Sequence, residues 1–318
     1  MTDEIKNKKA PQEFYTKNEN EENLTASKAE DGRSLYAEAW ARFRRNKLAM
    51  LGLVMAATVI LAAMSANLIA PYDPIKYSVW SSRDAVRFSP PSKAYIMGSD
   101  LLGRDIFSRV LFGARISLQI GIFATLVTLS IGVPLGAVAG YKGGLADDLI
   151  SWLVNVIFAF PFMLFVLAVV AVFKNPSLSL IYIAIGVVNW VQVCRVTRGQ
   201  FISLRSREFV EAARSLGLPS SRIIFRHILP NAVAPIIVQA TLGMGSIIMI
   251  EAGLAYLGFG AQPPTPSWGL MISEGQKYLG QGTWWWSVFP GLAIMYTVLS
   301  FNFVGDGLRD ALDVRLKR

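Results

Sequence analysis

The side chains that most often carry out catalysis or bind metals are scarce in this sequence. Its 318 residues include one cysteine, Cys194, and one histidine, His227. A single cysteine excludes an internal disulfide and a cysteine-based metal site, and a single histidine excludes a histidine-rich one. The sequence also lacks the phosphate-binding pattern G-x-x-x-x-G-K-[ST], a serine nucleophile elbow and the pattern H-E-x-x-H. We therefore expect no catalytic residue, no metal site and no ATP site of that type in the chain.

One acid interrupts a long apolar segment. Glu251 is the only charged residue in Asn231–Gly260. Placing a charge in lipid costs about 2.5–3.5 kcal/mol on insertion scales, so Glu251 is expected to face a subunit interface or a pore, near the outer end of the segment. It is either a pore or gate residue, or an interfacial acid paired with a basic neighbour. No second acid accompanies it, as a proton-coupled carrier would often need.

A polar stretch with helical spacing precedes that segment. Residues 206–230, SREFVEAARSLGLPSSRIIFRHILP, predict two short helices with a sharp turn between them. Gly217 can adopt the left-handed conformation that ends the first helix. Pro219 and Ser220 can begin the second, and Pro230 either stops it or bends it into the next apolar segment.

The first of these helices has the features of a contact surface. Ala212 and Ala213 leave room for another surface to approach closely. Glu211 is one acid among arginines, where it can pair within the loop or with a partner. A stabilising loop helix or a DNA-binding helix-turn-helix are the other interpretations. Apolar segments tether the loop at both ends, which argues against DNA, and we expect no nucleic-acid partner.

The composition places these motifs in a membrane protein. Hydrophobic residues make up 53% of the chain and charged residues 17%, against about 25% charged in soluble domains. A bilayer span needs about 20 apolar residues. Six segments meet or approach that length: Leu48–Ala70, Ile116–Gly140, Leu149–Phe173, Leu178–Cys194, Asn231–Gly260 and Trp284–Gly305. We predict an all-α polytopic membrane protein with six transmembrane helices, in which Pro134 and several glycines bend the second and Pro161 kinks the third.

Basic residues set the expected orientation. Lys and Arg gather before the first apolar segment, between residues 195 and 230, and at residues 315–318. With six spans these regions share one side, which the positive-inside rule makes cytoplasmic. Both termini are then cytoplasmic, and the net charge of +9 reflects the cytoplasmic loops. Trp268 and tryptophans 284–286 are expected at the outer interface, although the basic residues of 72–115 fit an outer location poorly.

The expected organisation follows from these segments. The chain begins with a polar stretch that lacks the apolar core of a signal peptide. The next stretch has an apolar face and a basic flank, typical of a helix lying on an anionic leaflet or of a simple lead-in to the first span. The predicted units are a disordered cytoplasmic tail (1–33), an amphipathic interfacial helix (34–47), the first transmembrane helix (48–70), an extracytoplasmic loop (71–115), a core of five transmembrane helices (116–305) that includes the cytoplasmic loop 195–230, and a cytoplasmic C-terminal tail (306–318).

Three sets of residues carry a resemblance to a known family. Glu211-Ala212-Ala213, Gly217 and Leu229-Pro230 match the spacing of the EAA loop of ABC importer permeases. Histidine replaces the usual isoleucine at position 227, which resembles the peptide subgroup. Residues 98–118 (GSDLLGRDIFSRVLFGARISL), 261–269 (AQPPTPSWG) and 305–313 (GDGLRDALD) look like segments of the C-type subunits of bacterial dipeptide and oligopeptide importers. The resemblance extends from about residue 40 to the end.

This resemblance implies the type I, MetI-like permease fold and a non-catalytic pore subunit in the bacterial cytoplasmic membrane. A paralogous permease subunit would supply the other half of the pore, and two ATP-binding subunits would hold ATP and Mg. An extracytoplasmic substrate-binding protein would deliver di- or oligopeptides. The loop residues Glu211, Ala212, Ala213, Gly217, Leu229 and Pro230 would couple this chain to the ATPase. No cofactor is implied in the chain itself.

Other functions remain open from the sequence. An importer of nickel or another non-peptide solute could use a permease of the same subgroup, because the binding protein largely sets the substrate. A secondary carrier would show broken helices in inverted repeats, and no clear repeat is visible. A membrane scaffold without transport is the third alternative.

Overall fold

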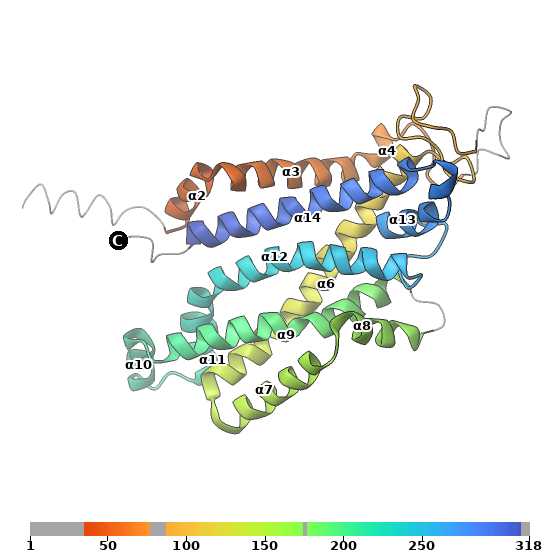
Figure 1. The fold of residues 1–318 in the computed structure, drawn as a ribbon. Helices are drawn as coiled ribbons and strands as arrows, with labels where there is room; N and C mark the ends of the chain where they lie inside the picture. Colours follow the sequence, from red (N-terminus) through yellow and green to blue (C-terminus); the bar gives the residue numbers. More distant parts are fainter. Residues whose placement is uncertain (1–34, 77–86, 174–176, 313–318) are drawn as a thin grey trace, which may run out of the picture.

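The computed structural model describes residues 35–76, 87–173 and 177–312. Over these residues the chain is a bundle of long helices lying side by side (Figure 1), and the one β contact is an isolated bridge between Ser99 and Asp105. The five helices long and apolar enough to span a membrane are α3 (Lys47–Met64), α6 (Ile106–Lys142), α9 (Leu178–Arg205), the continuous helix Ser220–Tyr256 and α14 (Trp285–Leu312). A sixth span results if the bent pair α7 (Gly144–Ala159) and α8 (Phe162–Ala171) counts as one. The all-α polytopic fold predicted from the sequence is confirmed.

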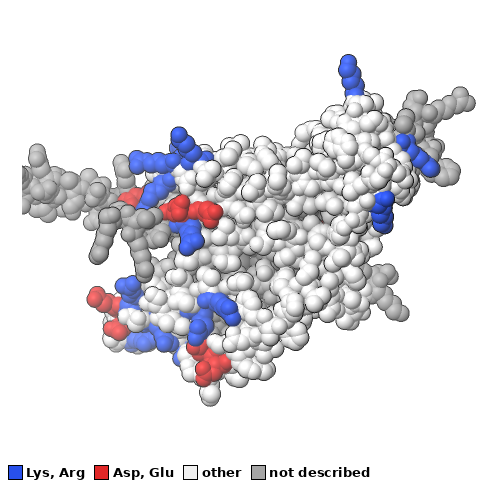
Figure 2. Space-filling model, in the orientation of Figure 1, with Lys and Arg blue, Asp and Glu red and all other residues white. Residues whose placement is uncertain are grey.

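The bundle has two chemically different ends. The basic end carries α2 (Leu35–Arg45), α10 (Glu208–Ser215), α11 (Ser220–Arg222) and the last turns of α14. The loop end carries α4 (Ala66–Ile69), the segment 87–105, α13 (Trp268–Gln276) and η2 (Leu279–Gln281). Figure 2 shows charged side chains at both ends and a broad uncharged band between them on this face. Such a band is what a helix bundle in a bilayer presents to lipid.

Glycines let α6 lie very close to α9. A Cβ at Gly136 would lie 2.5 Å from the Cys194 carbonyl oxygen, and Gly132 and Gly140 leave similarly little space. These glycines repeat every four residues, the small-xxx-small spacing of tightly packed membrane helices. Their role here is close packing against α9. Pro134 does not interrupt α6, which continues to Lys142.

The third apolar segment is broken rather than merely kinked. α7 ends at Ala159 and α8 begins at Phe162, with an angle of 89° between them. Phe160 adopts an extended conformation, as expected for a residue preceding a proline. The prediction that Pro161 disturbs this helix is confirmed.

Several helices extend beyond the apolar segments that predicted them. α6 begins at Ile106 rather than Ile116, and α9 continues past Cys194 to Arg205. α14 continues past Gly305 to Leu312, through residues expected to belong to the C-terminal tail. Hydropathy detects only the apolar part of a helix, whereas the charged turns of these helices find polar partners. Asp105 caps α6 by accepting hydrogen bonds from the backbone N–H of Ser108 at 2.7 Å and from its hydroxyl at 2.6 Å.

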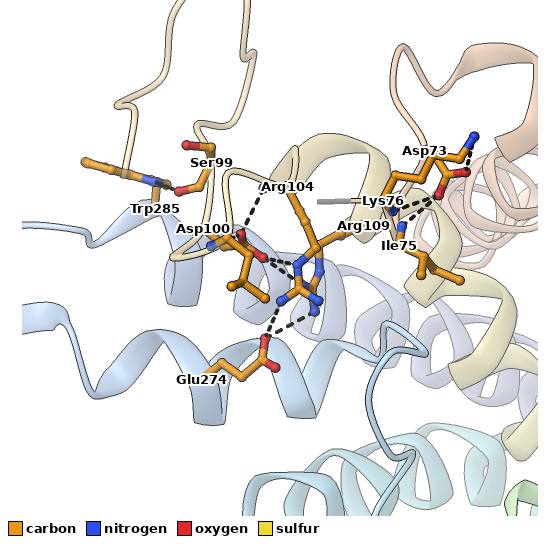
Figure 3. Close-up of polar contacts among 10 residues, drawn as sticks. Asp73, Ile75, Lys76, Ser99, Asp100, Arg104, Arg109, Glu274 and Trp285 are labelled. Atoms are coloured by element: carbon orange, nitrogen blue, oxygen red, sulfur yellow. Dashed lines mark hydrogen bonds and ion pairs between the residues drawn. The ribbon is translucent and has the colours of Figure 1, made fainter. Parts of the chain in front are cut away.

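A buried cluster of four charges holds the loop end together (Figure 3). Asp100 Oδ2 lies 2.6 Å from Arg104 Nε and 2.6 Å from Arg109 Nη1. Glu274 Oε2, from α13, lies 3.1 Å from Arg109 Nη2 and 3.5 Å from Arg104 Nη2. The two acids and two arginines balance in formal charge. Pairing within the protein therefore accounts for two of the basic residues that fit the expected outer location poorly.

Tryptophans pack into this end instead of facing the interface. Trp268 Nε1 donates to the Val110 carbonyl at 2.9 Å, and Trp285 Nε1 donates to the Ser99 carbonyl at 3.1 Å. Trp286 is also buried. Only Trp284 of the four is exposed, so an interfacial position fits that one residue.

Candidate functional site

The two neighbouring alanines of the loop helix α10 lie in different environments, because Ala212 is exposed and Ala213 is buried. Val210 and Ala213 are buried in a cluster with side chains of α6, α9 and the helix that follows α10. Glu211 and Ala212 are exposed. Ala213 therefore packs within the chain, and of the two alanines expected to admit another surface only Ala212 is accessible to one.

Gly217 ends α10 in the manner expected from the sequence. Its φ of +72° is left-handed. The Gly217 N–H donates to the Arg214 carbonyl at 2.9 Å, and the Leu218 N–H donates to the Ala213 carbonyl at 3.2 Å. These two bonds define a Schellman motif, and Leu218 packs in the same apolar cluster as Ala213. The turn is thus fixed by local chemistry, and it directs the chain from α10 into α11.

The second loop helix does not stop at Pro230. α11, the π-helical turn η1 (Ile223–Ile228) and α12 (Leu229–Tyr256) form one continuous helix. Proline has no N–H and its ring clashes with the carbonyl four residues earlier. The wider π turn directly before Leu229-Pro230 can accommodate the proline ring without breaking the helix. The Asn231 side chain donates a hydrogen bond to the His227 carbonyl at 2.7 Å. Leu229 and Pro230 therefore join the loop to the span without a hinge.

Contacts at the basic end fasten α9 to α7 and α6, and fasten α10 to α6. Arg198 Nε and Nη2 donate to the Asp147 carboxylate of α7 at 2.5 Å and 2.8 Å. Arg205 Nη1 donates to the Gly140 carbonyl at 3.2 Å, and the Arg214 guanidinium lies 5.4 Å from the ring centroid of Tyr141. A displacement of α10 would therefore be transmitted to α6, α7 and α9.

The outward side of the loop carries apolar and acidic groups together. Leu216 and Phe225 are 79% and 69% exposed, and Phe209 is also exposed. The Glu211 carboxylate forms no ion pair with any residue that the structure describes. We call Phe209, Glu211, Ala212, Leu216 and Phe225 the tip surface. Exposed aromatic and aliphatic side chains on a loop that also exposes an unpaired acid are features of a protein-binding surface.

Glu251 lies inside the chain rather than on its surface. Its side chain is fully buried, and Oε2 accepts a hydrogen bond from the Ser117 hydroxyl of α6 at 3.1 Å. Among the described residues no basic group pairs with it. The structure therefore places it at the contact between α6 and α12, and not on a pore or subunit surface as the sequence suggested.

A groove with polar lining runs between α9 and α12, and its residues were missed in the sequence. Two cavities of about 420 and 620 Å³ share Gln239 and Leu242. Asn189, Gln192 and Gln200 of α9 line them opposite Gln239. We call these four carboxamides and the space they line the amide groove. Asn189, Gln192 and Gln239 stand inside predicted apolar segments, whereas Gln200 falls in the predicted cytoplasmic loop 195–230. Asn189, Gln192 and Gln200 share one helical face, a periodicity that could have revealed them.

Comparisons with known proteins agree with the sequence motifs. Residues 132–318 match the family described as binding-protein-dependent transport system inner membrane component, and residues 34–91 match the N-terminal TM domain of oligopeptide transport permease C. The dipeptide transport system permease protein DppC of Alkalihalophilus pseudofirmus is 45% identical over 89% of this chain and 91% of its own length. The oligopeptide transport system permease protein OppC of Bacillus subtilis is 41% identical over 90% of this chain and 91% of its own. The glutathione transport system permease protein GsiD of Escherichia coli is 42% identical over 91% of this chain and 94% of its own.

The fold matches a solved transporter. A chain of the inward-facing MetNI methionine ABC transporter superimposes with a TM-score of 0.52, covering 64% of this chain and 96% of that one at 18% identity. This likeness shows the MetI-like permease fold alone. With the family match over residues 132–318 and the relatives above 40% identity, the chain belongs to the family of binding-protein-dependent transport system inner membrane components.

Proposed function

We propose that this chain is a permease subunit of an ATP-driven importer of di- or oligopeptides and forms half of its pore. The names of the relatives support the substrate class, since they transport dipeptides, oligopeptides or glutathione, itself a modified tripeptide. The nickel importer and the secondary carrier have no support from these relatives. The chain itself catalyses no reaction, and partner subunits hydrolyse ATP with Mg.

The proposed complex contains this chain, a paralogous permease subunit, two ATP-binding subunits and an extracytoplasmic substrate-binding protein. The basic end faces the cytosol, so both termini are cytoplasmic. The exposed basic residues of that end support this orientation, and so does the internal pairing of Arg104 and Arg109 at the loop end. Native mass spectrometry of the co-expressed system should show one copy of each permease and two ATPases. Two copies of this chain without a paralogue would contradict the heterodimer.

The observation that carries the proposal is the tip surface on a rigid support. Glu211 and Ala212 would contact the ATPase. Ala213 and Gly217 hold α10 in position, and Leu229 and Pro230 continue it into a span. An ATP-driven movement of a partner subunit can be transmitted to the pore only through a rigid structural element. The Schellman turn and the continuous helix Ser220–Tyr256 supply such an element.

Gly217→Val tests this coupling role. Valine pays roughly 1–2 kcal/mol or more in a left-handed conformation. A Cβ at this position would have no neighbouring atom within 4 Å, so the substitution introduces strain rather than a clash. We expect normal membrane levels, weak ATPase retention on pull-down and little peptide uptake. The matched control is Gly282→Val at the loop end, which has a φ of +82° and equally open surroundings.

The two variants separate coupling from general strain. Gly282→Val should retain the ATPase as the unmodified chain does. Normal ATPase retention and uptake in Gly217→Val would remove α10 as the coupling element. Equal loss of ATPase retention in both variants would mean that strain at any turn disrupts the complex.

Glu251 is proposed to hold α6 against α12 rather than to gate the pore. Glu251→Gln keeps an oxygen that can accept from Ser117. We expect unchanged assembly and unchanged uptake. Lost uptake with normal assembly would return Glu251 to the gating role suggested by the sequence.

A further inference from the structure

The four carboxamides of the amide groove are placed in register along two helices. On one face of α9, Gln192 follows Asn189 by three residues and Gln200 follows Asn189 by eleven. Gln239 of α12 lines both cavities, and Ser246 lies two turns further along the same face of that helix. The groove therefore runs from the middle of the bundle towards the basic end, where Arg309 is the one charged residue among the described residues that line it.

These amides have no partner among the described residues. No hydrogen bond joins the side chain of Asn189, Gln192, Gln200 or Gln239 to another described group, and none of the four is fully buried. A carboxamide left unpaired in an apolar environment costs from about 1 kcal/mol to several kcal/mol. Polar groups inside membrane spans accordingly face water-filled cavities or polar partners.

The chemistry of the groove matches a peptide main chain. Each carboxamide offers one acceptor oxygen and two N–H donors, the complement of the C=O and N–H groups of a peptide unit. Up to Arg309 the described lining residues are neutral, so they favour neither acidic nor basic side chains. Asn189 and Gln200 are about 16 Å apart along the helix axis at 1.5 Å per residue, which spans about five residues of an extended peptide.

We propose that Asn189, Gln192, Gln200 and Gln239 line the translocation path and hydrogen-bond the main chain of the passing peptide. This inference rests on the proposed function and adds to it a substrate-contacting site in this subunit. Main-chain recognition lets one path accept peptides that differ in their side chains. The competing occupant is a helix of the paralogous permease, because amides also bond across packed membrane helices.

Cysteine accessibility distinguishes the path from a packed interface. Gln192→Cys and Gln239→Cys are each placed in a Cys194→Ser background of the complete complex. An impermeant thiol reagent should label both in the state open to its side, and trialanine delivered by the binding protein should slow labelling. No labelling in any nucleotide state, or labelling that trialanine does not slow, would overturn the proposal in favour of packed helices.

Uptake of two peptides tests the hydrogen bonds themselves. Gln239→Leu should lower trialanine uptake about fivefold, the worth of one hydrogen bond, with unchanged ATPase retention. A trialanine methylated on both peptide nitrogens has lost those donors, so the same substitution should lower its uptake less, after correction for binding-protein occupancy. The matched control is Gln119→Leu, which removes an exposed amide from α6 outside the groove.

The outcomes separate this inference from the proposed function. Unmodified complex that imports no peptide on ATP would end the proposed function and this inference with it. Import by the unmodified complex, with equal uptake by Gln239→Leu, would overturn the inference alone. An equal effect of Gln239→Leu on both peptides, or an equal loss in Gln119→Leu, would also remove main-chain recognition.

Discussion

The charge cluster of the loop end and the acid of the tip surface are satisfied in different ways. At the loop end, Asp100, Arg104 and Arg109 are buried and paired with one another and with Glu274 (Figure 3). At the basic end, Glu211 is exposed and has no ion-pair partner among the described residues. Both ends contain acids and arginines, so composition alone does not separate them.

This difference in pairing indicates which charged groups are satisfied within the chain and which are available to a partner protein. Removing one partner of a buried ion pair is strongly destabilising, because it leaves the other charge buried without compensation. Water hydrates the exposed acid of the tip surface. Its exposed apolar residues would be stabilised by burial against another protein. We therefore assign a structural role to the charges of the loop end and a recognition role to Glu211.

The largest expected effect comes from removing the central acid of the loop-end cluster. Asp100→Asn leaves Arg104 and Arg109 with a neutral partner in a buried site. We expect the free energy of unfolding to fall by about 3–5 kcal/mol, measured as the loss of folded complex on heating in detergent. Asp148→Asn is the same change at an exposed acid of the basic end and should alter stability by less than about 0.5 kcal/mol. Equal stability of the two variants would break the comparison between the ends.

Glu274 should contribute less to the same cluster. Its side chain is 23% exposed, and its contacts with the two arginines are longer than those of Asp100. Water can therefore replace part of the interaction with the arginines that Glu274→Gln removes. We expect the free energy of unfolding to fall by about 1 kcal/mol. Thermal unfolding of the single variants and of Asp100→Asn/Glu274→Gln measures this. A double variant whose loss equals the simple sum would show that the two acids act independently.

Local chemistry explains why parts of both ends could be predicted from the sequence. The left-handed turn predicted at Gly217 depends on residues adjacent in the chain, and the structure confirms it. The N-cap that the structure shows at Asp105 also depends on adjacent residues. The break at Pro161 is local in the same sense, because a proline restricts the residue before it.

Features that depend on distant partners could not be predicted. Arg109 and Glu274 are 165 residues apart in the sequence, and hydropathy does not reveal such a pair. Trp268 was expected at the interface because its position near a span end is visible, whereas the direction of its side chain is not. Glu251 was placed on a surface for the same reason, since Ser117 stands 134 residues away.

Reversing the exposed acid of the tip surface should affect binding but not folding. Glu211→Lys alters no ion pair among the described residues, so stability should change by less than about 0.5 kcal/mol. ATPase retention should fall about two- to fivefold, the range of an exposed ion pair. Glu208→Lys changes another exposed acid in the first turn of α10 and controls for the helix dipole. Equal losses of ATPase retention in both variants would assign the effect to overall charge rather than to Glu211.

The smallest effect concerns two acids at the loop end whose pKa values shift in opposite directions. Hydrogen bonds from the backbone N–H groups of Ile75 and Lys76, at 2.9 Å and 3.1 Å, lower the pKa of Asp73. Burial raises the pKa of Asp105, although the hydrogen bonds from Ser108 oppose it. Asp73 thus contributes stability above its unfolded pKa of about 3.9, which is lost as the pH falls through its lower folded value. The contribution of Asp105 to stability has the opposite pH dependence, because its carboxyl group binds the proton more tightly in the folded state. Stability is therefore lost as the pH rises from about 4 through the folded pKa of Asp105.

Melting temperatures of the complex between about pH 3 and pH 6 separate these two contributions. The difference between Asp73→Asn and the unmodified chain should stay constant above about pH 4 and shrink below it. The difference for Asp105→Asn should change above about pH 4 instead, becoming more favourable to the variant as the pH rises, because asparagine caps the helix without burying a charge. If both differences changed over the same pH range, the two carboxyl groups would share one environment. The contrast between an exposed acid held by backbone donors and a buried cap would then be wrong.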